Sequence, residues 1–160
     1  HGFDDQGRQY DKDGNLKDWW TTEDAKNFEK RAAVMINHFD SIEVAPGVHA
    51  NGQFTLGENI ADHGGLQVSF QAFKKATSDK PLNTVQGFTP EQRFFLAYAN
   101  VWAGNIRPEE ILRLTKIDPH SLGKWRVDGA LPQIDAWYDA FNIQPGDPLY
   151  LPKDKRVNIW

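Results

Sequence analysis

The sequence predicts a mainly α-helical protein that forms a single unit. Apolar residues recur at spacings of three and four in several segments, which is the period of an amphipathic helix. Two of these segments start at a threonine with a partner three residues later, the arrangement of a helix capping box. The 160 residues have the length of one domain, and no repeat, linker or low-complexity segment divides them.

The first two helices are expected on either side of a Pro-Gly break at 46–47. Thr21 or Thr22 is expected to cap the first helix, and Asp24 stands where a capping box places its second residue. The predicted apolar face of this helix consists of Ala25, Phe28, Ala32, Met35 and Phe39. The second helix is expected over about 56–77, with an apolar side of Ile60, Val68, Ala72, Phe73 and Ala76.

The third helix follows a predicted surface loop and has the strongest start signal of the chain. Thr89 is expected as its cap, Pro90 at its first position, and Gln92 closes the capping box. Its apolar face consists of Phe94, Phe95, Tyr98, Val101 and Trp102. A short fourth helix is expected over 107–116 and a fifth over about 129–141, before an irregular tail rich in proline.

The composition argues against several kinds of partner. The chain has 18 basic and 22 acidic residues and no basic block, so neither a nucleic acid nor an anionic membrane is expected to bind it. No apolar run approaches the roughly 18 residues that a membrane span needs. The absence of cysteine excludes disulfides and thiolate metal sites. Because the sequence begins at His1 without an initiator methionine, we expect a fragment or a processed piece.

Two carboxylates on the second predicted helix are candidates for chemistry. Glu58 and Asp62 stand four residues apart, which places both side chains on one face of the helix. A solvated face would also explain such a pair. The small or apolar neighbours favour a packed helix instead, where two like charges repel unless a cation or hydrogen-bond donors hold them. One carboxylate could bind a metal while the other orients a histidine ligand.

Two histidines are further candidates. His1 could be an ordinary terminal histidine, or the last residue of a truncated H-E-x-x-H motif, in which two histidines bind zinc and the glutamate acts as general base. Such a site needs a third ligand, a role that Glu58 fits. His120 lies in a predicted loop before Arg126, and loop residues of this kind often bind ligands. A surface histidine with a nearby snorkelling arginine is the alternative.

Several strings stand in an order that resembles the neprilysin family of zinc metallopeptidases, which includes endothelin-converting enzymes and bacterial oligopeptidases. The strings are HGFDDQGR at 1–8, DGNL at 13–16, DWW at 18–20, TLGENIADHGGL at 55–66, FFL at 94–96, VWAG at 101–104, RPE at 107–109, and His120-Ser121 with Gly123 and Arg126. The chain also ends on a tryptophan, Trp160. Each string is short, but their order and spacing over nearly the whole chain are highly specific.

The resemblance implies a fold and a metal site. The fold is the helical C-terminal part of a thermolysin-like zincin catalytic domain, which this chain would contribute over residues 1–160 as one unit. His1 and Glu58 are similar to two of the three protein ligands of one Zn²⁺ ion per complete site. Asp62 resembles the carboxylate that orients the first zinc histidine. That histidine, the catalytic glutamate beside it and a lid domain lie outside this chain.

The resemblance also implies how a substrate is held. His120 resembles the donor to the oxyanion of the transition state, and Arg126 resembles the residue that holds the peptide backbone after the scissile bond. Val101 and Trp102 resemble the wall of the apolar pocket for the residue that follows that bond. Ala103 stands where the animal enzymes carry a cysteine. A bacterial relative located in the envelope, the periplasm or outside the cell is therefore expected.

The function implied is that of a zinc-dependent endopeptidase that cleaves oligopeptides. The chain by itself is expected to be inactive and its site free of zinc or wrongly coordinated, because one zinc ligand and the general base are missing. Its expected partners are the peptide substrate and the N-terminal portion of the same protein. The alternative is a non-catalytic helical module that binds a ligand or a protein through some of its six tryptophans.

Overall fold

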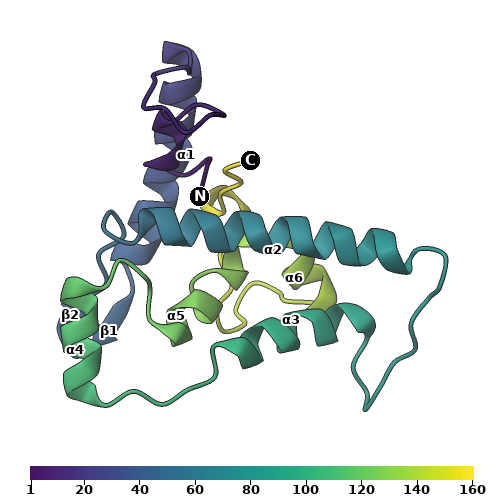
Figure 1. The fold of residues 1–160 in the computed structure, drawn as a ribbon. Helices are drawn as coiled ribbons and strands as arrows, with labels where there is room; N and C mark the ends of the chain where they lie inside the picture. The colour runs from purple at the N-terminus through teal and green to yellow at the C-terminus, as the bar shows by residue number, and fades with distance from the viewer.

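The computed structural model describes residues 1–160 and shows a mainly helical fold, which confirms the predicted class. The long helix α2 runs across the molecule, with α1 crossing it near one end and α3 and α6 lying along its other half (Figure 1). The helices are α1 (Thr22–Asp40), α2 (Leu56–Thr77), α3 (Pro90–Val101), α4 (Pro108–Ile117), α5 (Gly123–Asp128) and α6 (Asp135–Phe141). Three 3-10 turns occupy Gly7–Gln9, Leu131–Gln133 and Lys153–Lys155.

Both predicted capping boxes are present. Thr21 Oγ1 accepts a hydrogen bond from the backbone N–H of Asp24 at 3.1 Å, and Thr89 Oγ1 accepts one from Gln92 at 3.2 Å. The side chains of Asp24 and Gln92 accept from the backbone N–H of the capping threonines in return. These bonds satisfy N–H groups that the first turn of a helix leaves without partners, so α1 and α3 start where the sequence predicted.

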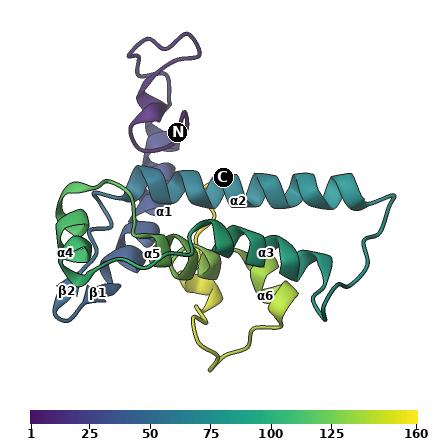
Figure 2. The same ribbon diagram turned by 60° about the horizontal axis from the view of Figure 1, so that its bottom comes forward.

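Two apolar clusters form the core, and α2 contributes to both. The first cluster joins α1, the start of α2 and the C-terminal segment; it contains Phe28, Ala32, Met35, Phe39, Leu56, Ile60, Val157 and Ile159. The second joins the middle of α2 to α3 and α6; it contains Leu66, Phe95, Ala130, Leu131, Ile134, Trp137 and Tyr138. The first turns of α2 are thus held between α1 and the C-terminal segment, near both chain ends (Figures 1 and 2).

The buried face of α2 differs from the predicted one. Val68 is 69% exposed and Ala72 and Ala76 are also exposed, so the prediction that they belong to the apolar side was wrong. The buried residues of α2 are Leu56, Asn59, Ile60, His63 and Leu66. Two of these are polar. A search for apolar residues alone missed this face, because hydrogen-bonded polar side chains can also be buried.

The region after α4 also differs from the prediction. A single helix over 129–141 was wrong in its first half, because Leu131–Gln133 form a 3-10 turn and α6 begins only at Asp135. The short helix α5 before this range was not predicted. Pro132 explains the break, because it lacks a backbone N–H and disfavours the α conformation at the residue before it. A short antiparallel hairpin of β1 (Glu43–Ala45) and β2 (Val48–His49) was not predicted. Its turn contains Gly47 at a φ of 71°, a conformation that favours glycine.

None of the helices is both long enough and apolar enough to cross a lipid bilayer. This finding concerns the helices of residues 1–160 alone.

Two hydrogen bonds between side chains link His63 of α2 to the C-terminal segment. His63 is 1% exposed, and its Nε2 lies 3.1 Å from the amide nitrogen of Gln67. The same amide nitrogen donates to Asn158 Oδ1 at 3.1 Å. Nε2 of His63 is therefore an acceptor, which requires the neutral imidazole. Burial lowers the pKa of His63, although the nearby backbone of Val157 and Gln133 acts in the opposite direction.

We expect the chain to lose stability in mild acid because of this histidine. The unfolded chain takes up the proton near the ordinary pKa of about 6.5, whereas folded His63 resists protonation. The stabilisation is complete above that pH and is lost as the pH falls toward the lower pKa of the folded state. Its slope is at most about 1.4 kcal/mol per pH unit. His38, whose pKa is also lowered by burial, adds a contribution in the same direction.

The measurement is the free energy of unfolding by urea between about pH 7 and pH 5. His63→Gln is expected to reduce the slope, and the same change at exposed His49 serves as the control substitution. Equal slopes for the original chain and for His63→Gln would contradict this account.

Candidate active site

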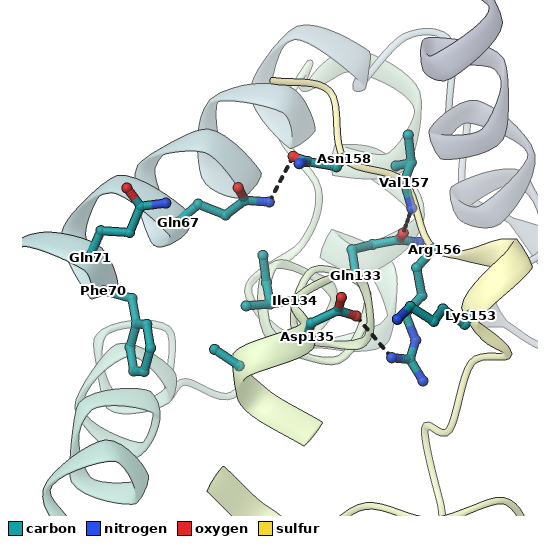
Figure 3. A pocket seen from close by; sticks show the side chains of 11 residues that line it. Gln67, Phe70, Gln71, Gln133, Ile134, Asp135, Lys153, Arg156, Val157 and Asn158 are labelled. Atoms are coloured by element: carbon teal, nitrogen blue, oxygen red, sulfur yellow. Dashed lines mark hydrogen bonds and ion pairs between the residues drawn. The ribbon is translucent and has the colours of Figure 1, made fainter. Parts of the chain in front are cut away.

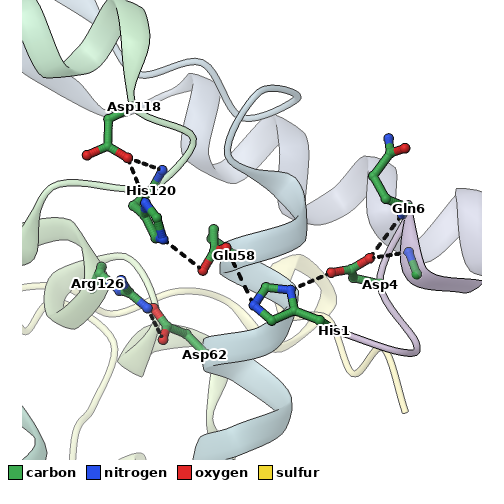
Figure 4. A network of polar contacts seen from close by, with 9 residues as sticks. His1, Asp4, Gln6, Glu58, Asp62, Asp118, His120 and Arg126 are labelled. Atoms are coloured by element: carbon green, nitrogen blue, oxygen red, sulfur yellow. Dashed lines mark hydrogen bonds and ion pairs between the residues drawn. The ribbon is translucent and has the colours of Figure 1, made fainter.

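The predicted site residues meet beside the first two turns of α2 (Figure 4). Glu58 points outward from this helix between two histidines that come from distant parts of the sequence. Its Oε1 lies 3.5 Å from Nε2 of His1, and its Oε2 lies 3.4 Å from Nε2 of His120. The Glu58 side chain is 22% exposed, whereas the two histidines are more open to solvent. Folding therefore brings together three of the residues singled out from the sequence.

The spacing of His1 and Glu58 fits two ligands of one zinc ion. Zinc binds imidazole nitrogen and carboxylate oxygen at about 2.1 Å, so two such atoms at tetrahedral corners lie about 3.4 Å apart. The observed 3.5 Å matches this value and is too long for a strong hydrogen bond. The chain alone does not arrange three or more potential ligands around a common point. His1 and Glu58 would thus provide two positions of a site that needs more.

Asp4 orients His1, and it is a site residue that the sequence prediction missed. Its Oδ2 lies 2.7 Å from His1 Nδ1, so Nε2 of the ring faces Glu58 (Figure 4). The other oxygen, Oδ1, accepts hydrogen bonds from the backbone N–H groups of Gln6 at 3.0 Å and Gly7 at 2.7 Å. Asp4 is only 5% exposed. A buried carboxylate at the far nitrogen of a histidine is the usual support of a metal ligand.

Gly7 allows the N-terminal segment to turn back tightly on His1. A Cβ atom at position 7 would lie 1.8 Å from the carbonyl oxygen of His1, a distance that no side chain can occupy. Because the backbone of Gly7 can approach that of His1 so closely, its N–H group reaches Asp4 Oδ1 and donates a hydrogen bond to it. The sequence does contain a signal for the missed residue, since an aspartate follows the candidate zinc histidine after three positions.

Asp118 orients His120 in a similar way. Its Oδ1 lies 2.6 Å from His120 Nδ1 and also accepts from the backbone N–H of His120 at 3.0 Å. The backbone hydrogen bond, followed by the side-chain one, lowers the pKa of Asp118. The carboxylate thus stays ionised and holds the ring with Nε2 directed toward Glu58. This arrangement presents a nitrogen of His120 to any group that binds at Glu58.

Asp62 binds Arg126 instead of a histidine of this chain. Its two oxygens accept from Nε and Nη2 of Arg126, both at 2.7 Å, and the two side chains are 12% and 13% exposed. The guanidinium also lies 3.8 Å from the ring centroid of Trp102. Burial disfavours the charged guanidinium, but Asp62 outweighs this effect and raises the pKa of Arg126. Arg126 is thus a fixed cation next to Glu58, with the hydrogens of Nη1 left for another partner.

The two residues predicted to form an apolar wall lie in different surroundings. Trp102 lines a cavity of about 460 Å³, together with Ile106, Ile111, Leu122 and Trp125. Val101 does not line this cavity and is 71% exposed. A separate pocket of about 440 Å³ lies between α2 and the C-terminal segment, where Gln133 and Arg156 line it (Figure 3). It contains none of the predicted site residues.

Comparisons with known proteins agree with the resemblance. The family model described as "Peptidase family M13" matches residues 1–157. The chain is 38% identical to human neprilysin over 165 aligned positions and 40% identical to bovine endothelin-converting enzyme 1 over 153. These alignments cover 100% and 93% of the chain, but 22% and 20% of the relatives. The chain therefore spans about a fifth of the length of these curated relatives.

Solved structures give the same result. The chain superimposes with a TM-score of 0.95 on the zinc metalloprotease ZMP1 of Mycobacterium tuberculosis in complex with an inhibitor, at 38% identity. The TM-score is 0.84 for PEPO of Lactobacillus rhamnosis, at 36% identity. Both superpositions cover the whole chain and about a quarter of the other protein, 25% and 24% respectively. With the family model matched over nearly its full length, this chain belongs to peptidase family M13.

Proposed function

We propose that this chain is part of a zinc-dependent endopeptidase that cleaves oligopeptides. The observation that carries the proposal is the 3.5 Å separation of His1 Nε2 and Glu58 Oε1, with Asp4 fixing the histidine ring. The family match and the likeness to a zinc metalloprotease support it. We further propose that an H-E-x-x-H motif ending in His1 supplies the remaining zinc histidine and the general base. The complete protein is this chain together with that preceding segment.

Some residues of this chain would hold the metal, and others would contact the peptide. His1 and Glu58 would hold the zinc ion, which when bound polarises the scissile carbonyl and activates a water molecule. Asp4 would keep Nε2 of His1 free for the metal. His120 would donate a hydrogen bond from Nε2 to the negative oxygen that develops on the carbonyl.

Arg126 would hold the substrate backbone. Two of its donors bind Asp62, and the hydrogens of Nη1 are free to donate to a peptide carbonyl. Trp102 stacks against the guanidinium and would form part of the neighbouring apolar pocket. Val101 has no such contact, so its role in that pocket is proposed from the resemblance alone.

We expect the complete protein to cleave a short peptide and the isolated chain to cleave none. A chelator should abolish the cleavage and added zinc should restore it, since the metal is required for the activation of water. Mass spectrometry of the peptide products after incubation with each protein checks this. Chelator-sensitive cleavage by the isolated chain would contradict the proposed division of the site.

The alternative of a non-catalytic module has less support. Phe95 belongs to the core and is 1% exposed, and Phe94 and Tyr98 pack against the same cluster. These aromatic residues of α3 are therefore not a docking surface. A location in the bacterial envelope or outside the cell stays a proposal based on the resemblance, which cell fractionation would test.

A further inference from the structure

We propose that Asn59 and Ser121 are positioning residues that hold His120 opposite Glu58. Asn59 follows Glu58 on α2, and Ser121 follows His120 in the loop before α5. Ser121 Oγ donates a hydrogen bond to Asn59 Oδ1 at 2.7 Å, across a separation of 62 residues. This bond ties the loop to the helix at the position next to the facing pair.

The Asn59 side chain is itself held by a hydrogen bond to the residue one helical turn earlier. Its Nδ2 donates to Thr55 Oγ1 at 2.9 Å, and Thr55 Oγ1 donates to the backbone carbonyl of Asn51 at 3.0 Å. Asn59 and Thr55 are 3% and 6% exposed. Each group in this chain of bonds donates to the next, so the order determines which atom of the Asn59 amide faces Ser121. A flipped amide would place its oxygen opposite Thr55 Oγ1, so that either two acceptors would face each other or the carbonyl of Asn51 would lose its partner.

The bond is one of a series between the same two segments. Glu58 faces His120, Asn59 binds Ser121, and Asp62 binds Arg126 from the following helix. The start of α2 and the segment 120–126 are thus joined at three positions, and Figure 4 shows two of these pairs, Glu58 with His120 and Asp62 with Arg126.

Asp118 and Ser121 constrain His120 in different ways. Asp118 lies on the same loop as His120 and binds its Nδ1, so it sets the rotation of the ring. It cannot set the distance between the loop and α2, because it moves with the loop. The bond from Ser121 to Asn59 sets that distance. His120 is 46% exposed at its side chain, so packing alone does little to hold it.

The test uses Ser121→Ala, which removes the bond between the segments and leaves the buried pair of Asn59 and Thr55 intact. Ser69→Ala is the matched control, because the hydroxyl of Ser69 bonds only to the carbonyl of Leu66 within α2. Ser121→Thr restores a hydroxyl. The first readout is the nuclear Overhauser contact between the His120 ring protons and the Glu58 side chain in the 160-residue chain.

We expect this contact to be lost in Ser121→Ala and kept in the other two variants. Its persistence in Ser121→Ala, or its absence from the unaltered chain, would overturn the proposal. Since this measurement needs no catalysis, it decides the positioning role even if the complete protein proves not to be a peptidase.

The second readout rests on the proposed function and uses the complete protein. Ser121→Ala should lower kcat by about 10- to 100-fold, as expected for a misplaced catalytic group, while KM changes little. The zinc content should stay the same, because Ser121 contacts neither proposed ligand. Ser121→Thr should recover most of kcat. An unchanged kcat in Ser121→Ala, in an otherwise active enzyme, would also overturn the proposal.

Discussion

Replacing Glu58 with alanine in the complete protein is expected to weaken zinc binding by more than about 100-fold and to abolish peptide cleavage. Loss of a residue that merely supports a ligand costs roughly 10- to 100-fold in metal affinity, and loss of the ligand itself should cost more. The 3.5 Å spacing to His1 supports the proposal that Glu58 is a direct ligand, and no other carboxylate faces Nε2 of His1.

The measurement is zinc content after dialysis against a competing chelator, together with the rate of peptide cleavage. Glu109→Ala is the control, because Glu109 is an exposed glutamate at the start of α4. Circular dichroism should show that both variants keep their helices, since Glu58 is not part of the buried face of α2. Normal zinc content and activity in Glu58→Ala would contradict the peptidase proposal and favour a non-catalytic module.

The second large effect is expected from His120→Ala, which should lower kcat by about 10²- to 10³-fold. A donor aimed at the developing oxyanion acts in the transition state and contributes little to the binding of the unreacted peptide. The loss should therefore fall on kcat, and KM and zinc content should remain close to those of the unaltered enzyme.

Steady-state kinetics of the complete protein check this, with His49→Ala in the exposed hairpin as the control. A rise in KM at constant kcat would show that His120 binds the substrate uniformly instead of stabilising the transition state. A loss of zinc in His120→Ala would assign the residue to the metal.

The helices of this protein were largely predictable because their signals are local. A capping threonine and its partner lie three residues apart, so Thr21 with Asp24 and Thr89 with Gln92 marked the starts of α1 and α3 correctly. The face of α2 was not predictable in the same way. Asn59 bonds to Ser121 in the loop before α5, and His63 is linked through Gln67 to Asn158 of the C-terminal segment. The periodicity of α2 itself contains no sign of these partners.

The candidate site was also predictable only in part, because its residues were identified from motifs and their contacts depend on the fold. A family motif identified Glu58, His1 and His120 as important, but the resemblance left their arrangement as an expectation. Asp4 escaped the sequence prediction because its role depends on the tight turn at Gly7. Asp62 was expected to orient an absent histidine, and in the folded chain it binds Arg126, 64 residues away.

By itself, the sequence determined the helical class, the starts of the first four helices and the identity of the main candidate residues, since these depend on neighbouring residues or on short motifs. Only the tertiary structure decided which of these residues meet. The contacts of Glu58 with His1 and His120, and the bond from Ser121 to Asn59, join segments that are far apart in the sequence. Their geometry depends on how the two apolar clusters place the loop and the N-terminal turn against α2, which no local pattern encodes.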